Sequence, residues 1–248
     1  MTKVAIVTGA SRGIGAATAL LAAAKGYHVA VNYLHSEQAA NDIVANIVDA
    51  GGRAIAIQGD TGAESDIVRM FETVDRELGP ITSLVNNAGI AQTIMRLETM
   101  DEARLARTWA VNITGYFLCA REAIRRMSTA NGGAGGTIVN VSSAAARLGG
   151  PGEWIDYAAS KGAIDTMTLG LAKEVGAEGV RINAVRPGLI ETDIHATAGA
   201  PERVERLVSG VPMQRSGTAH EVAESILWLM EPESSYVTGA LVDIGGGR

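Results

Sequence analysis

The chain has 248 residues, of which 47% are hydrophobic, and a formal net charge of −6. This length allows a sizeable core in one large α/β domain, and the scarcity of proline, with 6 residues, gives no sign of a linker between smaller domains. Lysine and arginine are scattered along the chain, which argues against nucleic-acid binding, and no apolar run reaches membrane-spanning length. We therefore expect a cytoplasmic protein with neither a nucleic-acid nor a membrane partner.

Short β-branched runs, nearly continuous in apolar residues, alternate with longer helical patterns, as in sheets whose strands are buried on both faces. Strands are predicted near 3–8, 27–33, 53–58, 81–86, 136–142, 180–186 and 240–244. The alternation predicts a single-domain α/β fold of the Rossmann type over 1–248, in which helices flank a doubly wound, seven-stranded parallel sheet.

A glycine-rich turn at 8–15 follows the first predicted strand and leads into a helix predicted at 16–25. Gly9 allows a tight turn, Gly13 lets the backbone approach a pyrophosphate, and Gly15 permits close packing of helix on strand. The start of the helix offers unpaired N–H groups to phosphate. The turn therefore predicts a nucleotide site, although a merely structural turn is the alternative. Its cofactor-binding residues would be Gly9, Ser11, Arg12, Gly13, Ile14 and Gly15.

Cysteine and histidine give no pattern of a disulfide or a metal site. The single cysteine, Cys119, excludes an intrachain disulfide and lies in an apolar run where a buried position is expected. The four histidines show no ligand spacing such as His-x-x-x-His. No metal centre is therefore predicted.

Tyr157 and Lys161 are four residues apart at the predicted start of a helix, so they share one helix face. A fixed cation near a phenol lowers the pKa of the tyrosine, which would make the pair a tunable general acid/base. The same spacing is also common where the tyrosine packs on a core and the lysine is solvated.

Other motifs accompany this pair in order along the chain: the Gly-x-x-x-Gly-x-Gly turn, residues 86–89 after the fourth strand, Asn112 within a helix predicted from 101 to 127, and Ser142 with Ser143 after the fifth strand. Together they resemble the classical short-chain dehydrogenase/reductase family over essentially the whole chain. The resemblance implies hydride transfer between a nicotinamide and a carbonyl or secondary alcohol.

By this resemblance the catalytic residues are Asn112, Ser143, Tyr157 and Lys161. Ser143 and Tyr157 would stabilise the developing alkoxide, and Tyr157 would give up its proton during reduction. Lys161 would lower the pKa of the tyrosine and bind the nicotinamide ribose. Asn112 would hold a water near the lysine, unless it is a satisfied core asparagine.

The resemblance also implies cofactor contacts at the ends of the predicted strands. Asp60 would bind adenine, although Asp60 or Thr61 could equally cap a helix beginning near Glu64. Outside the glycine-rich turn, the predicted cofactor-binding residues are Asn32, Tyr33, Asp60, Thr61, Asn87, Ala88, Gly89, Tyr157, Lys161, Pro187, Gly188, Ile190 and Thr192.

Residues 32–36 carry no carboxylate where an NAD site has an acidic residue for the ribose hydroxyls. Arg12 could instead bind the 2′-phosphate of NADP through its fork-shaped guanidinium. We therefore predict NADP(H) rather than NAD(H). NAD(H) stays open because NADP-preferring relatives often have a second basic residue where this chain has Leu34 or His35, and because Arg12 could simply be solvated.

The substrate side is the least predictable part of the chain. The loop between Ser143 and Tyr157 is one residue longer than in many relatives, and Glu153 and Trp154 are expected to form a substrate wall there. A mobile lid carrying a short helix is predicted at about 191–217. Glu153 and His195 could bind a polar substrate or be solvated.

Two substrate classes compete within the family, a 3-oxoacyl-[acyl-carrier-protein] and a glucose-type sugar. Glu178 stands where carrier-protein reductases tend to have arginine, although Arg125 and Arg126 could still grip an acidic carrier. A non-catalytic NADP-binding regulator is the alternative from a different class, and the lack of a Gly-x-Ser-x-Gly elbow excludes a serine hydrolase of the α/β type.

The resemblance implies a homotetramer, with a homodimer possible, built through helices such as the one after Tyr157. The stripe Ile164, Met167, Leu171 and Val175 on that helix could serve the interface or the core.

Overall fold

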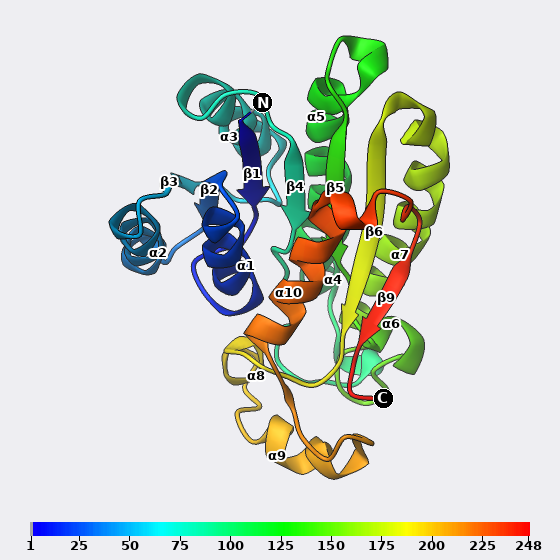
Figure 1. The fold of residues 1–248 in the computed structure, drawn as a ribbon. Helices are drawn as coiled ribbons and strands as arrows, with labels where there is room; N and C mark the ends of the chain where they lie inside the picture. The colour runs from blue at the N-terminus through cyan, green and yellow to red at the C-terminus, as the bar shows by residue number, and fades with distance from the viewer. Residues whose placement is uncertain (1) are drawn as a thin grey trace.

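The structure is a computed structural model that describes residues 2–248, apart from the side chain of His195, so the expectation for that histidine lies outside the described residues. Seven parallel strands form one sheet in the order β3-β2-β1-β4-β5-β6-β9 (Figure 1). They are β1 (Lys3–Val7), β2 (Tyr27–Tyr33), β3 (Arg53–Gln58), β4 (Ser83–Asn86), β5 (Gly136–Val141), β6 (Val180–Pro187) and β9 (Leu241–Ile244). The predicted Rossmann-type sheet is confirmed.

Helices cover both faces of this sheet, which explains why its strands are apolar throughout. One face packs against α1 (Gly13–Ala24), α2 (Glu37–Asp49) and α10 (Ala219–Met230). The other packs against α3 (Glu64–Glu77), α5 (Gly115–Met127) and α7 (Ile155–Val175). Ile164, Met167 and Val175 are buried in this second layer, with Leu171 packed beside them, so the stripe on α7 is core.

The strand order places a crossover beside β1. The chain runs outward from β1 through β2 to β3 and then returns to form β4 on the other side of β1. Parallel strands end at the same edge of the sheet, and ligands of doubly wound folds bind where the order reverses. The loops after β1 and β4 therefore meet at the expected site.

The helix predicted from 101 to 127 is present but changes its winding in the middle. It comprises α4 (Glu102–Trp109), a π-helical segment (Ala110–Thr114) and α5. Asp101 caps its start by accepting a hydrogen bond from the N–H of Arg104 at 2.8 Å. The wider π turn holds Asn112, and such turns occur frequently at functional sites.

The segment predicted as a lid lies beyond the carboxyl ends of the strands (Figure 1). It carries two short helices rather than one, α8 (Ile194–Thr197) and α9 (Arg203–Leu207). Two short strands at its base, β7 (Ile190–Glu191) and β8 (Gly217–Thr218), pair with each other and were not predicted. This pairing ties the two ends of the segment together.

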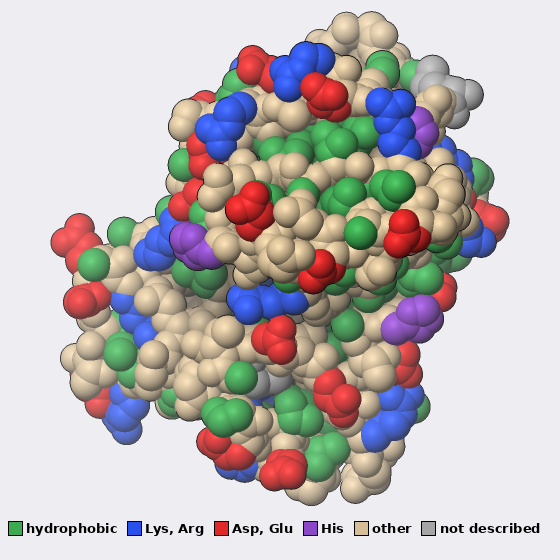
Figure 2. All heavy atoms as spheres, turned by 90° about the vertical axis from the view of Figure 1, so that its left-hand side faces the viewer, with side chains coloured by type: hydrophobic (Ala, Val, Ile, Leu, Met, Phe, Trp, Pro, Cys, Tyr) green, Lys and Arg blue, Asp and Glu red, His purple; other side chains and the backbone are tan. Residues whose placement is uncertain are grey.

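Charged side chains of both signs are interspersed on the face shown in Figure 2. Within residues 2–248, no helix is both long and apolar enough to cross a membrane.

Candidate active site

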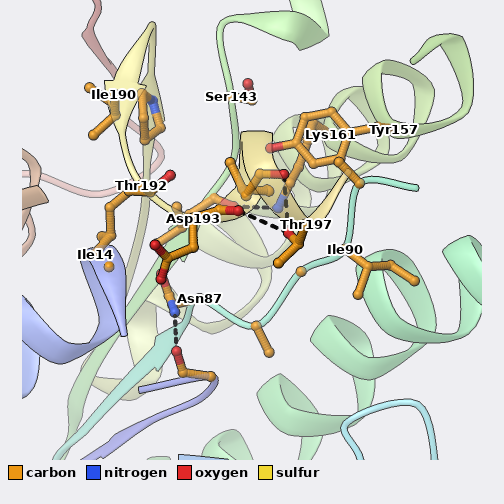
Figure 3. Close-up of a pocket in the computed structure, with 18 of the residues that line it drawn as sticks. Ile14, Asn87, Ile90, Ser143, Tyr157, Lys161, Ile190, Thr192, Asp193 and Thr197 are labelled. Atoms are coloured by element: carbon orange, nitrogen blue, oxygen red, sulfur yellow. Dashed lines mark hydrogen bonds between the residues drawn. The ribbon is translucent and has the colours of Figure 1, made fainter. Parts of the chain in front are cut away.

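A cavity of about 760 Å³ opens at the carboxyl edge of the sheet, beneath the segment with α8 and α9 (Figure 3). Nineteen predicted catalytic or cofactor residues line it: Gly9, Ser11, Arg12, Gly13, Ile14, Asn32, Tyr33, Asp60, Thr61, Asn87, Ala88, Gly89, Ser143, Tyr157, Lys161, Pro187, Gly188, Ile190 and Thr192. Gly15 and Asn112 stand behind the wall instead.

The glycine-rich turn adopts the backbone that its sequence requires. Gly9 and Gly13 have positive φ angles of 61° and 55°, which favour glycine. Helix α1 begins at Gly13 with no side-chain cap and no acidic residue in its first turn, so its first N–H groups and its positive dipole end are available to an anion. A Cβ atom on Gly15 would lie 2.6 Å from the amide nitrogen of Asn87, which makes this glycine a packing residue rather than a ligand contact.

Asn32 lines the cavity but its side chain is committed to the protein. Its Oδ1 accepts a hydrogen bond from the N–H of Gly9 at 3.1 Å, and its Nδ2 donates to the carbonyls of Ile57 and Gly59. This buried amide therefore holds the glycine-rich turn in place, and direct contact between Asn32 and the cofactor stays a prediction.

Asp60 is held by an arginine that the sequence did not single out. Its carboxylate pairs with Arg107 of α4 at 2.9 Å and accepts a hydrogen bond from the N–H of Gly62 at 2.8 Å. Helix α3 begins at Glu64 after Ala63, with no side-chain cap, so the capping alternative for Asp60 or Thr61 was wrong. Arg107 also lines the cavity, and its 47-residue separation from Asp60 explains why no local pattern revealed the pair.

Asn112 is fully buried and clamps the segment after β4 to the catalytic helix. Its Oδ1 accepts from the N–H of Ile90 at 2.9 Å, while its Nδ2 donates to the carbonyl of Ile90 and to Oγ of Ser160. A Cβ atom on Gly89 would lie 3.5 Å from both Asn112 Oδ1 and Lys161 Nζ. The asparagine and the lysine are thus neighbours across a glycine.

Ser143, Tyr157 and Lys161 come together where β5 ends and α7 begins (Figure 3). Ser143 accepts at its Oγ from the N–H of Ala145 at 3.1 Å, and its hydroxyl is near enough to the phenol of Tyr157 to act on the pKa of that group. Lys161 is 2% exposed and donates from Nζ to the hydroxyl of Tyr116 at 3.0 Å and to the carbonyl of Val141 at 2.7 Å. Its ammonium lies 5.6 Å from the centroid of the Tyr157 ring.

Burial dominates the electrostatics of this pair. It lowers the pKa of Lys161 to about 7, against an opposing effect of Asp165. It also raises the pKa of Tyr157, and the opposing contributions come from the hydrogen bond of Ser143 and the charge of Arg203. The pKa of the tyrosine is therefore raised and not lowered as predicted, because desolvation outweighs the contributions of Ser143 and Arg203.

The loop before α7, where a substrate wall is predicted, is joined by ion pairs to the segment with α8 and α9. Glu153 pairs with Arg203 at 2.9 Å and with Arg206 at 2.6 Å, so its carboxylate is engaged in ion pairs, which neither predicted alternative, substrate binding or solvation, included. Trp154 lines the cavity as expected, and its indole N–H donates to the carbonyl of Gln92 at 2.7 Å. The two lid arginines were missed because nothing local distinguishes them from solvated residues.

A buried ion pair holds the start of the catalytic helix. Arg104 of α4 donates from Nε to Asp156 at 2.8 Å and from Nη1 to the carbonyl of Thr93 at 2.7 Å. Asp156 in turn accepts the backbone N–H of Tyr157 at 2.9 Å. The position of the tyrosine thus depends on a contact across 52 residues of sequence.

Comparisons with known proteins agree with this geometry. A family profile described as "Enoyl-(Acyl carrier protein) reductase" matches residues 9–248. The chain is 54% identical to the Escherichia coli protein "Uncharacterized oxidoreductase YgfF", over 99% of each chain. It is 38% identical to a 3-oxoacyl-[acyl-carrier-protein] reductase of Synechocystis, over 99% of this chain and 96% of the relative.

Two solved structures share the fold over nearly their full length. A short chain dehydrogenase from Burkholderia cenocepacia in complex with NADP matches with a TM-score of 0.91 and 33% identity, covering 100% of this chain and 98% of that one. A blue fluorescent protein from a metagenomic library in complex with NADPH matches with a TM-score of 0.90 and 36% identity, covering 99% and 97%. The chain is therefore an oxidoreductase that belongs to the short-chain dehydrogenase/reductase family.

Proposed function

We propose that this oxidoreductase uses NADP(H) to interconvert a carbonyl compound and a secondary alcohol, with Ser143, Tyr157 and Lys161 at the reacting end of the cavity. The observation that carries the proposal is that Ser143, Tyr157 and Lys161 line the same cavity as the glycine-rich turn. One cavity thus combines a phosphate cradle and a proton donor.

The nucleotide end fits a dinucleotide. The left-handed glycines and the uncapped start of α1 suit a pyrophosphate. Arg12 lines the cavity, and no ion pair to it is found within residues 2–248, so its guanidinium is available to a 2′-phosphate. Two of the similar structures hold NADP or NADPH, which supports the same choice here.

The side chains supply position and protons. A bound nicotinamide would supply the hydride. Ser143 and Tyr157 would donate hydrogen bonds to the carbonyl oxygen, and Tyr157 would then give its proton to the developing alkoxide. Lys161, whose pKa is about 7, can hold or release a proton near neutral pH behind the tyrosine. Asn112, through Ile90 and Ser160, would keep the segment beside the lysine in place.

Replacing Tyr157 with phenylalanine tests the assignment. NADPH binding, followed by fluorescence, is expected to stay within about twofold, whereas turnover should fall by about 10²–10⁴-fold because the proton donor is lost. Unchanged turnover would overturn the catalytic role and favour the non-catalytic regulator. Equal affinities for NADH and NADPH would remove the argument from Arg12.

A small carbonyl or alcohol is favoured over a carrier protein. Arg125 pairs with Glu122, and Arg126 pairs with Glu122 and Asp75, so the cations that could grip an acidic carrier are already neutralised. A sugar remains the competing small substrate. NADPH oxidation measured against aldehydes, ketones, diketones and 3-oxoacyl thioesters, with NADP-linked sugar oxidation alongside, separates these classes.

We also propose a cytoplasmic homotetramer with a lid at about 191–217 that moves during turnover. With the stripe on α7 committed to the core, the exposed side chains of Phe117 on α5 and Leu169 on α7 are the apolar groups that a neighbouring subunit would cover. Light scattering that gives a monomer would contradict the assembly.

A further inference from the structure

One cation of the lid reaches the reacting end of the cavity. Arg203 of α9 lines the cavity, and its guanidinium lies 4.5 Å from the centroid of the Trp154 ring. The Trp154 ring meets the Tyr157 ring edge to face at 6.3 Å. The charge of Arg203 is felt at the tyrosine, where it acts to lower the pKa of the phenol. Arg203 is therefore close to the group that handles the carbonyl oxygen.

The partners of Arg203 fix its orientation without cancelling the local charge. Its Nε and Nη2 atoms contact one oxygen of Glu153 at 3.0 and 2.9 Å, while the other oxygen accepts from Arg206 at 2.6 Å. Two cations thus share one carboxylate. The side chain of Arg203 is 16% exposed and lines the cavity, whereas that of Arg206 is 51% exposed and does not. The excess positive charge lies at the inner edge of the lid.

Apolar side chains line the same cavity as Arg203. They include Leu148, Leu189, Ile194 and Leu207.

We propose that Arg203 binds an anionic group of the substrate, a carboxylate, while the carbonyl of the same molecule lies against Ser143 and Tyr157. The substrate class is then an oxo acid, or the corresponding hydroxy acid in the reverse direction. This inference rests on the proposed carbonyl chemistry of the site. A guanidinium already oriented by one carboxylate presents its remaining N–H donors in a fixed plane, which is the geometry that a second carboxylate requires.

Matched substrates and matched arginine variants test the inference. The probes are 2-, 3-, 4- and 5-oxo acids of four to six carbons, each compared with its neutral methyl ester in NADPH-dependent reduction. At least one acid should exceed its ester in kcat/KM by about tenfold or more. Arg203→Gln should lower kcat/KM for that acid at least about tenfold more than for its ester, with Arg203→Lys intermediate, so that the ratio of acid to ester reports the contact with the carboxylate.

Arg206→Gln is the control, because Arg206 binds the same glutamate without lining the cavity, and the ratio of acid to ester should stay unchanged. The inference is overturned if the wild type reduces each acid and its ester equally. It is also overturned if Arg203→Gln and Arg206→Gln lower acid and ester turnover alike, because the ion pairs with Glu153 would then only hold the segment with α9 in place. Failure of NADPH oxidation with every carbonyl tested would instead overturn the proposed function itself.

Discussion

Replacing Asp156 with alanine removes the only anion in contact with the buried guanidinium of Arg104 among residues 2–248. The two side chains are 6% and 2% exposed, so the small value of a solvated surface pair does not apply. Removing one partner of a buried pair costs about 3–5 kcal/mol, because the other charge stays buried without compensation. The N–H of Tyr157 loses its acceptor in the same variant.

For a chain of this size the loss corresponds to a fall in Tm of about 6–20 °C. Thermal unfolding followed by circular dichroism measures it, at one protein concentration because the assembly state affects Tm. The control is Glu77→Gln, which removes the surface ion pair between Glu77 and Arg76. The side chain of Arg76 is 65% exposed and that of Glu77 is 49% exposed. This variant should stay within about 0.5 kcal/mol of the wild type.

An apolar double variant separates stability from positioning. Arg104→Met with Asp156→Leu should recover most of the stability, since apolar residues often replace buried pairs without loss. It should not recover turnover, because Thr93 and the start of α7 are no longer joined. The reasoning is refuted if Asp156→Ala lowers Tm no more than the Glu77 control.

Three further predictions follow from burial and packing. Burial lowers the pKa of Lys161 from 10.5 to about 7, so between these pH values the unfolded chain binds a proton that the folded chain does not. Urea unfolding should therefore show the wild type gaining stability relative to Lys161→Met as the pH rises from 7 to 10. Burial raises the pKa of Cys119 to about 12, so a thiol reagent at pH 8 should label it only after denaturation. Gly15→Ala places a Cβ atom 2.6 Å from the side chain of Asn87, so it should lower the free energy of unfolding by about 1–3 kcal/mol and weaken NADPH binding. The control is Gly176→Ala, whose Cβ atom meets nothing within 4 Å and should change neither the stability nor the NADPH affinity.

The sheet and the phosphate cradle could be predicted because their signals are local. A strand buried on both faces must be apolar throughout, and a left-handed turn before a helix favours glycine, so β1 and the turn at Gly9 and Gly13 are visible in a few consecutive residues. Ser143 and Tyr157 follow from the same logic, since the end of a parallel strand and the start of the next helix meet at one edge.

The charged framework of the site could not be predicted, because each of its contacts joins distant segments. Arg104 and Asp156 are 52 residues apart, and Arg203 and Glu153 are 50 residues apart. An isolated arginine or glutamate looks like a solvated residue until folding supplies its partner. The π turn at Asn112 escaped prediction for a related reason, since its hydrogen bonds to Ile90 and Ser160 are tertiary contacts.

The pair Tyr157 and Lys161 shows how the structure changes the chemical account. A spacing of four residues suggests that the lysine turns the tyrosine into a base, yet burial raises the pKa of the phenol and lowers that of the ammonium. Near neutral pH the tyrosine therefore keeps its proton, while the lysine titrates in the same range. Burial thus holds both groups away from their charged forms, which a spacing of four residues on a helix could not reveal.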